Sequence, residues 1–419
     1  MSDPADLTAT AAARAISAGT LRPADLLEAC LARTAAREPA VHAWAFHDPA
    51  AVRAARPNPG PLHGLPLGVK DVFDTACCPS EYNSPIWRGH RPRADAAAVA
   101  WARSAGALVF GKTVTTEFAH RHPGPTANPH DPARTPGGSS SGSAAAVAAG
   151  MVPFALGTQT AGSVIRPAAF CGVVGYKPTF GLIPRFGMKL MSDTFDTVGT
   201  LARSVADCAL LAEALSGQVL GDPDRHTGAH PRVGICRTPA WPRAEPDTQA
   251  LLDRAATRLA AAGATVRDLP LPPVFDAAEA AHAVVMNAES ARALGWELTT
   301  ARAGISPVLR ERLEWGLSQP PAVLADAHAL LDGLRLGFPD LLDDLDFVLT
   351  PSAPGEAPLG LDWTGDAGFN FLWTALHAPC VTVPAGSGAN GMPLGLQVVA
   401  RRGADRAALA WAAWVAGAL

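Results

Sequence analysis

Two segments rich in glycine and hydroxyl side chains carry much of the chemical information in this chain. The first, residues 135–150, is a Gly/Ser run that leads directly into an alanine-rich helix former. Backbone N–H groups and hydroxyls at the start of a helix form a natural site for an anion or an oxyanion. In the second, residues 157–167, Ser163 follows Gly162 just before another expected helical turn. The N–H groups of residues 160–163 could converge there on one oxygen.

Lys70 is the third candidate, at the end of a short apolar strand expected at residues 67–69. Burying an ammonium group is costly unless its pKa falls or it finds partners. A neutral lysine is a usable general base. A surface lysine at the end of a strand explains the same residues, so both interpretations stay open from the local sequence.

Two other serine or phosphate motifs compete for these segments. A phosphate-binding loop has the glycine spacing of residues 157–162, but it requires a lysine where Ser163 follows. The G-x-S-x-G nucleophile elbow fits residues 138–142, with Ser140 as nucleophile and Asp346 and His377 as partners. That elbow must follow a strand, whereas residues 128–136 are polar and proline-rich, which argues against it.

A metal-dependent hydrolase is a further alternative, based on three histidines close together in the sequence: His120, His122 and His130. Their spacing matches no zinc motif, and acidic ligands nearby are sparse. These residues therefore argue against a metal site.

Helices and strands alternate along the chain, and these elements must position the candidate residues. Helices are expected at residues 23–38, 94–105 and 246–262. Strands are expected at residues 67–69, 107–110, 232–236, 264–269, 347–349, 379–383 and 394–399. Gly106 and Gly263 each end a helix and precede a strand. The alternation predicts an α/β fold, with a mixed central β-sheet sandwiched between layers of α-helices.

The chain has 419 residues, more than the ~250–300 at which single cores stop growing, so one large or two smaller domains are possible. We expect a single domain over residues 1–419. Residues of about 275–335 look almost wholly helical; they are either an insertion that covers the active site or ordinary core helices.

Composition excludes several functional classes. The formal net charge is −4 and no long run of Lys or Arg occurs, so no nucleic-acid partner is expected. The seven cysteines are scattered and odd in number, which favours a reducing compartment over a disulfide framework. Residues 1–10 do not read as a signal peptide, and the most apolar segments, 144–156 and 407–419, are too short to span a membrane. We expect a cytoplasmic protein without a membrane partner.

Taken together, the candidate segments resemble the amidase-signature family. The likeness includes Gly-Val-Lys-Asp at residues 68–71 and the runs at residues 135–150 and 157–179. It continues at residues 196–199, 203–207, 350–354, 379–384 and 391–397, in the family's order and spacing. The resemblance covers residues 7 to 406, and it looks closest to the malonamidase-like and carboxybiuret-hydrolase-like members.

The resemblance implies a role for each residue of the constellation. Ser163 is the nucleophile, Ser139 the bridging hydroxyl and Lys70 the base, because a serine hydroxyl attacks poorly until a base takes its proton. Ser140 and Thr158 support them, and Ser140 is expected to hydrogen-bond the lysine. The oxyanion is expected to be stabilised by the N–H groups of Thr160, Ala161, Gly162 and Ser163. The resemblance also implies that neither a metal nor an organic cofactor is required.

Further details follow from the same resemblance. The peptide bond between Gly138 and Ser139 is expected to be cis. Ala161 stands where many relatives have glycine, so its Cβ restricts the backbone. Arg166 is implied to grip a substrate carboxylate, although a structural arginine bound to backbone carbonyls explains it equally well. His377 either binds substrate or packs in the core.

The implied function is hydrolysis of a small linear carboxamide, with release of ammonia through an acyl-enzyme on Ser163. A substrate that bears a carboxylate, such as malonamate, is favoured, and a carboxylated ureide is the alternative. An alternative of another class is an amidase-like subunit of a multi-protein amidotransferase. A homodimer is expected by analogy with small relatives.

Overall fold

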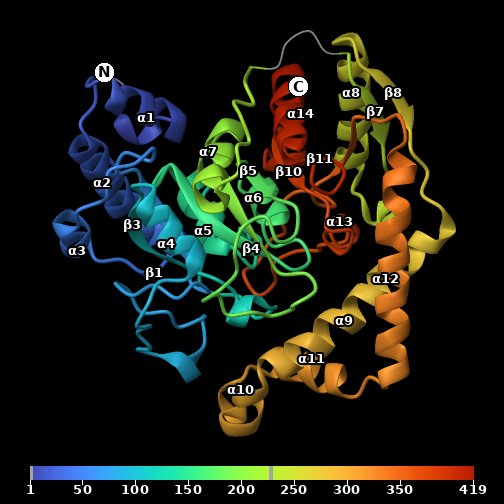
Figure 1. Ribbon diagram of the computed structural model, residues 1–419, viewed down its shortest axis with the longest axis horizontal. Coiled ribbons are helices and arrows are strands. Elements are labelled where there is room, and N and C mark those ends of the chain that lie inside the picture. The colour runs from blue at the N-terminus through green and yellow to red at the C-terminus, as the bar shows by residue number, and fades with distance from the viewer. Residues whose placement is uncertain (1–2, 226–229) are drawn as a thin grey trace.

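The computed structural model describes residues 3–225 and 230–419. Within them, one eleven-stranded sheet crosses the molecule in the order β1-β3-β2-β4-β6-β5-β10-β11-β9-β7-β8 (Figure 1). The strands are β1 (Trp44–Phe46), β2 (Pro66–Lys70), β3 (Leu108–Thr113), β4 (Phe154–Gln159), β5 (Val174–Lys177), β6 (Thr197–Ala202), β7 (Arg232–Ile235), β8 (Thr265–Asp268), β9 (Phe347–Pro351), β10 (Cys380–Ser387) and β11 (Pro393–Val399).

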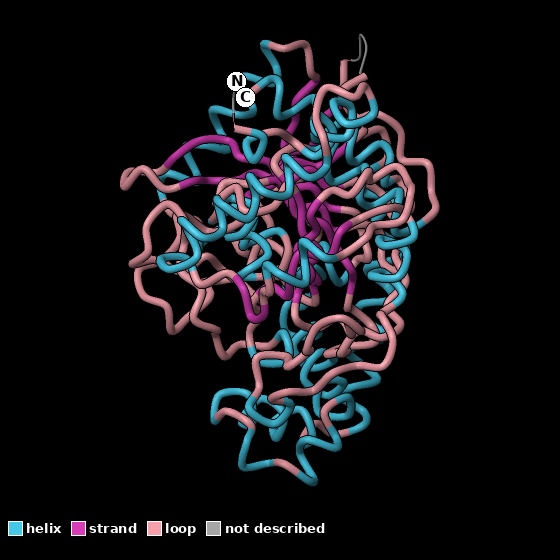
Figure 2. The backbone as a smooth tube through the Cα atoms, turned by 90° about the vertical axis from the view of Figure 1, so that its left-hand side faces the viewer, coloured by secondary structure: helices cyan, strands magenta, loops and turns pink. Residues whose placement is uncertain are grey.

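The sheet is mixed, as predicted. Strand β2 runs parallel to both β3 and β4, and β7 runs parallel to both β8 and β9. The other pairs are antiparallel, including β4 with β6 and β10 with β11. In the side view the strands lie in the interior, between helices (Figure 2). The predicted α/β sandwich is therefore confirmed.

Fourteen α-helices accompany the sheet within the described ranges. They are α1 (Ala9–Ser17), α2 (Pro23–Val41), α3 (Pro49–Ala54), α4 (Ala97–Ser104), α5 (Ser141–Ala148), α6 (Ile165–Phe170), α7 (Val205–Ser216), α8 (Pro246–Ala261), α9 (Ala278–Ala293), α10 (Gly295–Thr300), α11 (Pro307–Leu317), α12 (Pro321–Leu342), α13 (Phe371–Ala375) and α14 (Asp405–Ala418).

Glycines in the sheet let α6 approach one face closely. A Cβ on Gly199 of β6 would lie 2.9 Å from the side chain of Val164, and one on Gly175 of β5 would lie 2.6 Å from Ala168. The next residue of β6, Thr200, points to the opposite face because side chains alternate along a strand. There its hydroxyl donates to the carbonyl oxygen of Cys208 in α7 at 3.4 Å. Helices α6 and α7 therefore cover opposite faces.

Every predicted helix and strand is present, but the prediction was incomplete. It missed strands that include the edge strand β1, and it missed the helices α1, α3, α7, α13 and α14. The three expected helices are α2, α4 and α8, and all seven expected strands are present. The sequence prediction missed β1, β4, β5 and β6. Strands β4, β5 and β6 are buried along their whole length, so they show no alternation of polar and apolar residues that could reveal them.

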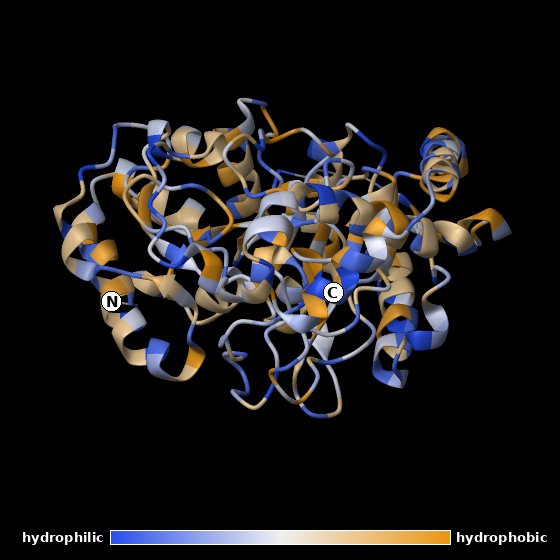
Figure 3. Ribbon diagram, turned by 90° about the horizontal axis from the view of Figure 1, so that it is seen from below, coloured by the Kyte–Doolittle hydropathy of each residue, from blue (hydrophilic) through white to orange (hydrophobic). Residues whose placement is uncertain are grey.

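Helices α9 to α12 form an arm that extends away from the sheet (Figure 1). They account for most of the segment predicted to be helical at residues 275–335. Hydrophobic residues gather in the interior of the molecule (Figure 3). Among the described residues, no helix combines the length and apolar character needed to cross a membrane.

Candidate active site

Lys70 lies at the end of β2, and its side chain is completely buried. Its Nζ lies 2.7 Å from Ser139 Oγ and 2.7 Å from Thr158 Oγ1. The carbonyl oxygen of Thr158 is 3.4 Å away. Thr158 belongs to β4, which pairs with β2, so the strand pairing brings this threonine beside the amine.

Burial lowers the pKa of Lys70 well below its ordinary value, and the charge of Asp196 opposes this shift. A neutral amine has two N–H donors and one lone pair. Thr158 offers two oxygens as acceptors for the donors, which leaves the lone pair for the proton of Ser139. The surroundings of Lys70 thus suit a general base that takes a proton from a hydroxyl.

Ser139 lies just before α5, and the peptide bond between Gly138 and Ser139 is cis, as predicted. The predicted hydrogen bond from Ser140 to Lys70 is wrong. The Ser140 hydroxyl donates instead to the Thr158 carbonyl at 3.3 Å and accepts from the Thr158 N–H at 3.2 Å. Because the Thr158 side chain occupies the position beside the amine, Ser140 acts on Lys70 only through Thr158.

Ser163 lies two residues before α6 and lines a cavity of about 290 Å³. Its carbonyl oxygen accepts a hydrogen bond from the N–H of Ser140 at 3.3 Å, which connects the two serine loops. The hydroxyls of Ser139 and Ser163 form no direct hydrogen bond, although both residues are described. Catalytic hydrogen bonds often become short only when substrate binds, so the relay between these serines stays a proposal.

The loop between β4 and α6 presents unused backbone donors. Within the described chain, no acceptor takes the N–H protons of Thr160, Ala161, Gly162 or Ser163. Ala161 does not have a positive φ, so an alanine fits this loop without strain. A Cβ on Gly162 would lie 2.4 Å from Asn370 Oδ1, so glycine is required there for space. These four donors are available to an oxyanion.

Two residues that the sequence did not single out hold this loop in place. The Oε1 of Gln159 accepts from the N–H groups of Val164 and Ile165 at 2.9 and 3.0 Å. Asp196, buried beside the loop, accepts from the Thr160 hydroxyl at 2.5 Å. Burial raises the pKa of Asp196, and the Thr160 hydroxyl opposes that rise. The Gln159 contacts are local to this loop, whereas the Asp196 contact joins residues 36 positions apart. Both residues lie in the motifs at residues 157–179 and 196–199, but the sequence alone did not reveal what they contact.

The cavity beside Ser163 combines apolar walls with several charged groups. Apolar side chains of Met191, Met286 and Phe371 line it. The polar lining residues are His120, Arg121, Arg166, Arg243, Glu279, Thr364 and Asp366. Arg243 forms ion pairs with Glu279 at 2.5 Å and with Asp366 at 3.4 Å. Helix α9 contributes Glu279 and Met286 to this lining.

Arg166 is buried, and its two terminal nitrogens are already engaged. Nη1 donates to the carbonyl oxygen of Gly365 at 2.7 Å, and Nη2 donates to the carbonyl oxygen of Gly138 at 2.7 Å and to Thr364 at 3.1 Å. Burial lowers the pKa of Arg166 to about 10. Its Nε is buried without a partner. Because both terminal nitrogens already donate to protein oxygens, a bidentate contact between them and a substrate carboxylate would break existing hydrogen bonds. Arg166 therefore ties the loop at Gly138 to the cavity wall.

The remaining predicted site residues lie elsewhere. His377 stacks on Phe180 with ring centroids 4.3 Å apart, and its Nε2 lies 2.8 Å from the carbonyl oxygen of Thr194. It does not line the cavity, so the structure supports its packing role. Asp346 bonds the N–H of Arg232 and has no contact with Ser140. The nucleophile elbow is thus not assembled.

The three histidines of the metal alternative also separate. His120 lines the cavity, His122 lies in another pocket, and His130 Nε2 bonds the carbonyl oxygen of Cys171 at 2.9 Å. Over residues 3–225 and 230–419, no three or more His, Cys, Asp or Glu side chains gather in a way that could hold a metal.

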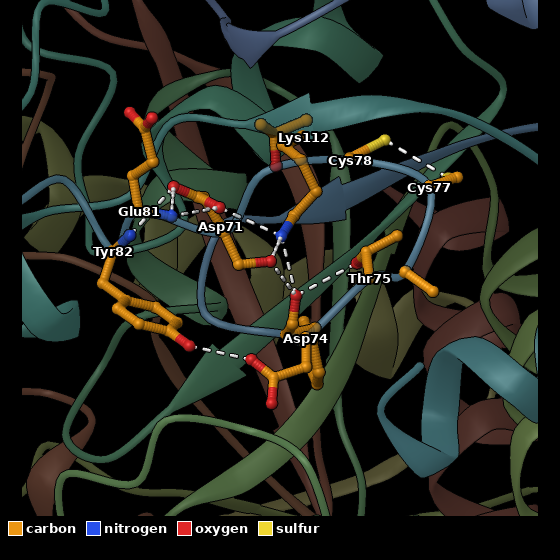
Figure 4. Close-up of polar contacts among 12 residues, drawn as sticks. Asp71, Asp74, Thr75, Cys77, Cys78, Glu81, Tyr82 and Lys112 are labelled. Atoms are coloured by element: carbon orange, nitrogen blue, oxygen red, sulfur yellow. Dashed lines mark hydrogen bonds and ion pairs between the residues drawn. The ribbon is translucent and has the colours of Figure 1, made fainter. Parts of the chain in front are cut away.

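A buried ion pair fastens the loop that follows Lys70 (Figure 4). Asp71 lies 3.0 Å from Nζ of Lys112 on β3, and both side chains are buried. Lys112 also donates to the carbonyl oxygen of Phe73 at 2.7 Å and to Ser80 Oγ at 2.5 Å. Asp71 accepts from the N–H of Tyr82 at 3.0 Å. These contacts hold the backbone next to Lys70 in one conformation.

Thr158→Val tests whether the threonine hydroxyl orients the lysine. We expect kcat to fall about tenfold with little change in KM, because the variant loses one hydrogen bond worth roughly 1–1.5 kcal/mol. The acidic limb of the pH profile should move to lower pH, because the ammonium form of Lys70 loses an acceptor. Steady-state kinetics over the range of about pH 5–9 measure both effects. Thr158→Ser keeps the hydroxyl and should restore activity; an unshifted pH limb in the valine variant would argue against the role.

Comparison with known proteins places this geometry in a family. The family model described as Amidase matches residues 25–409. The chain is 34% identical over 454 residues to a glutamyl-tRNA(Gln) amidotransferase subunit from Chloroflexus aggregans, covering 94% of this chain and 93% of that protein. A crystal structure of an amidase is similar with a TM-score of 0.88 and 33% identity, over 99% of this chain and 100% of that one.

A peptide amidase from Stenotrophomonas maltophilia has a TM-score of 0.81 and 29% identity, over 97% of this chain and 96% of that chain. The matches extend along nearly the whole sequence, and the range matched by the family model includes the buried lysine and the two serine loops. The chain therefore belongs to the amidase family, and it is a hydrolase of amide C–N bonds.

Proposed function

We propose that this chain hydrolyses a small linear carboxamide and releases ammonia through an acyl-enzyme on Ser163. One observation carries the proposal: the amine of Lys70 is buried, has a lowered pKa and lies 2.7 Å from the hydroxyl of Ser139. The residue after Ser139 in the same loop, Ser140, bonds the backbone of Ser163. These contacts support the assignment of Lys70 as base, Ser139 as bridging hydroxyl and Ser163 as nucleophile.

The proposed reaction uses each group at a defined atom. Ser163 Oγ attacks the amide carbon while its proton passes to Ser139 Oγ, and the proton of Ser139 passes to Lys70 Nζ. The negative oxygen of the tetrahedral intermediate accepts from the free N–H groups of residues 160–163. The C–N bond then breaks, and the relay returns the proton to the departing ammonia. Water, activated by the same relay, then releases the carboxylic acid from Ser163.

The cavity favours an acyl group that carries hydrogen-bond acceptors. Arg121 lines it and forms no hydrogen bond or ion pair within the described residues. Burial lowers the pKa of His120 to about 3, so its ring is neutral. Asn287 lies close enough to oppose this shift, but neither buried ring nitrogen has a partner in good hydrogen-bond geometry. The Nε of Arg166 is likewise unpaired. A carboxylate-bearing amide such as malonamate, or a carboxylated ureide as in the malonamidase-like and carboxybiuret-hydrolase-like members, would satisfy these donors.

Because the terminal nitrogens of Arg166 are occupied, we propose that Arg121 supplies the charge that selects a carboxylate. Arg121→Ala should lower kcat/KM for malonamate by roughly 10–100-fold, the equivalent of losing one charge-assisted hydrogen bond. Isovaleramide offers an uncharged branched acyl group of similar size, and its kcat/KM should change less than about threefold. Arg312 lies near Arg121 but does not line the cavity, so Arg312→Ala is the matched control. Equal losses on both amides would refute charge selection by Arg121.

A second candidate function is favoured by the relatives in sequence. The protein from Chloroflexus aggregans is named as a subunit of an amidotransferase, and the likeness covers most of both chains. By this proposal, the chain would release ammonia from a donor amide and deliver it to a partner protein. The cavity contains both acidic and basic groups, Glu279 and Asp366 beside Arg121, which would suit a donor with a carboxylate and an ammonium group, such as glutamine.

Ammonia release by the purified chain alone separates the two candidates. Rapid turnover of malonamate, isovaleramide or glutamine without any other protein supports a free-standing hydrolase. Turnover that depends on an added partner supports the amidotransferase role.

We further propose that α9 covers the cavity, since it contributes Glu279 and Met286 to the lining. The homodimer and the cytoplasmic location stay predictions.

A further inference from the structure

Two adjacent cysteines lie in the loop that follows β2, outside the cavity that Ser163 lines. The sulfur atoms of Cys77 and Cys78 are 3.3 Å apart, and Figure 4 shows the two side chains directed toward each other. All seven cysteines are free. Cys77 is exposed, whereas the other six are buried: Cys30, Cys78, Cys171, Cys208, Cys236 and Cys380.

A fixed positive charge lies beside the exposed sulfur. Nη2 of Arg103 in α4 lies 2.7 Å from Cys77 Sγ. The same guanidinium pairs through Nε with Asp95 at 2.9 Å, and the other carboxylate oxygen of Asp95 accepts from the N–H of Ala76 at 2.8 Å. Asp95 therefore holds both Arg103 and the backbone next to Cys77, so the charge and the thiol are kept together.

These surroundings favour the thiolate of Cys77 over its thiol. The hydrogen bond from the Cys78 thiol and the charge of Arg103 lower the pKa of Cys77 to about 6, against an opposing effect of burial. The pKa of Cys78 is raised, chiefly because its thiol donates to Cys77. At other cysteines burial favours the less reactive thiol form: it raises the pKa of Cys30 to about 12 and that of Cys380 to about 11. Thiolates react with peroxides and buried thiols do not.

We propose that Cys77 and Cys78 form a peroxide-reactive pair, in which Cys77 is oxidised first and Cys78 closes a reversible disulfide. The exposed sulfur, the adjacent second thiol and the fixed guanidinium are the features on which this assignment rests. A low-pKa exposed cysteine beside a resolving cysteine is the arrangement found in thiol redox sensors.

The chemistry balances with a hydroperoxide as the oxidant. The Cys77 thiolate attacks one peroxide oxygen, an S–O bond forms, the O–O bond breaks, and hydroxide or alkoxide leaves. Cys77 is then a sulfenic acid. The sulfur of Cys78 attacks it, the S–O bond breaks, and water leaves with the proton of the Cys78 thiol. The two cysteines have lost two electrons in total, and the peroxide has gained them.

The disulfide should be easily reduced, because the ring between adjacent residues is small and strained geometry makes such a bond more reducible. The loop also resists movement, since Lys112 binds Ser80 Oγ and the carbonyl oxygen of Phe73 on either side of the pair. We therefore expect oxidation to be fully reversed by dithiothreitol.

The test treats the full-length protein with hydrogen peroxide and maps each cysteine by differential alkylation and mass spectrometry. In the wild type, Cys77 and Cys78 should be lost together, with a mass decrease of two hydrogens that dithiothreitol restores. Cys78→Ser should stop at a sulfenic acid on Cys77 that dimedone traps. Cys77→Ser should abolish the fast reaction, and Cys30→Ser, a buried control, should behave as the wild type.

Arg103→Met tests the charge separately. We expect the rate constant for oxidation of Cys77 to fall roughly tenfold, because a smaller share of its thiol is ionised at neutral pH. Thermal unfolding measurements check that each variant folds. The cysteine mapping of the oxidised wild type tests the proposal even if a variant fails to fold. Wild-type oxidation that spares Cys78, or a Cys77→Ser variant that consumes peroxide as fast as the wild type, would overturn the proposal.

Discussion

Lys70→Met is expected to lower kcat for amide hydrolysis by about 10²–10⁴-fold, the range that a positioned general base contributes. The substitution keeps the length and burial of the side chain but removes the atom that lies 2.7 Å from Ser139 Oγ. Neither serine would then have an acceptor for its proton. Initial rates of ammonia release at saturating substrate measure the effect.

Folding should not suffer from this change, because methionine suits a buried apolar position better than an amine does. The thermal unfolding midpoint should therefore stay the same or rise. Lys177 is the matched control, since it is another fully buried lysine, on β5, which bonds the carbonyl oxygens of Pro178 and Ala378. Lys177→Met should leave kcat of the folded protein close to wild type. Similar losses of kcat in both variants would mean that Lys70 acts only through structure.

The pH profile of the wild type provides an independent check on the base. Burial lowers the pKa of Lys70, so the amine is neutral over a wider pH range than an exposed lysine. Only the neutral form accepts a proton, so kcat/KM should be high above that pKa and should fall as the pH decreases through it. An acidic limb well below the ordinary lysine pKa is expected. A rate that keeps rising up to the ordinary lysine pKa would contradict a neutral Lys70.

Ser163→Ala should have the largest effect of any single change, a loss of roughly 10⁵–10⁶-fold in kcat, because it removes the atom proposed to form the covalent bond. Hydroxylamine captures acyl-enzymes by transfer of the acyl group to its nitrogen. In the wild type it should accelerate consumption of the amide when deacylation limits the rate. In Ser163→Ala no hydroxamate should form.

Ser139→Ala distinguishes the nucleophile from the relay. The variant retains Ser163 but removes the hydroxyl proposed to pass its proton to Lys70. The rate of acylation should therefore fall, while the acyl group should still attach to Ser163. Rapid quenching followed by peptide mass spectrometry should find the acyl group on Ser163 in both the wild type and Ser139→Ala. An acyl group on Ser139 or Ser140 would refute the assignment of Ser163.

Much of this site could be inferred from sequence because its chemistry is encoded locally. Lys70, Ser139 and Ser163 each stand in a distinctive run of neighbours, and the cis peptide before Ser139 accompanies the same motif. Several strands and helices outside the centre of the sheet also had local signals, such as Gly263 between α8 and β8, although the edge strand β1 did not. Short-range features of this kind do not depend on what the rest of the chain packs against.

The partners of these residues depended on tertiary structure. The Ser140 hydroxyl binds the backbone of Thr158, and the Thr158 side chain, not Ser140, binds the amine of Lys70. The pairing of β2 with β4 determines these partners. Asp196 binds the Thr160 hydroxyl in the loop that precedes Ser163, and this contact joins residues 36 positions apart. The terminal nitrogens of Arg166 are taken up by Gly138 and Gly365, an outcome that the local sequence left open.

The amino-acid sequence alone determined which groups are proposed to react: one amine, two hydroxyls and the N–H groups of a glycine-containing loop. Folding of the whole chain is what desolvates the amine, places it against Ser139 and leaves Arg121 unpaired in the cavity that Ser163 also lines. The physical reason is that desolvation, ion pairing and hydrogen-bond satisfaction are set by every group packed nearby, and most of those groups lie far away along the chain.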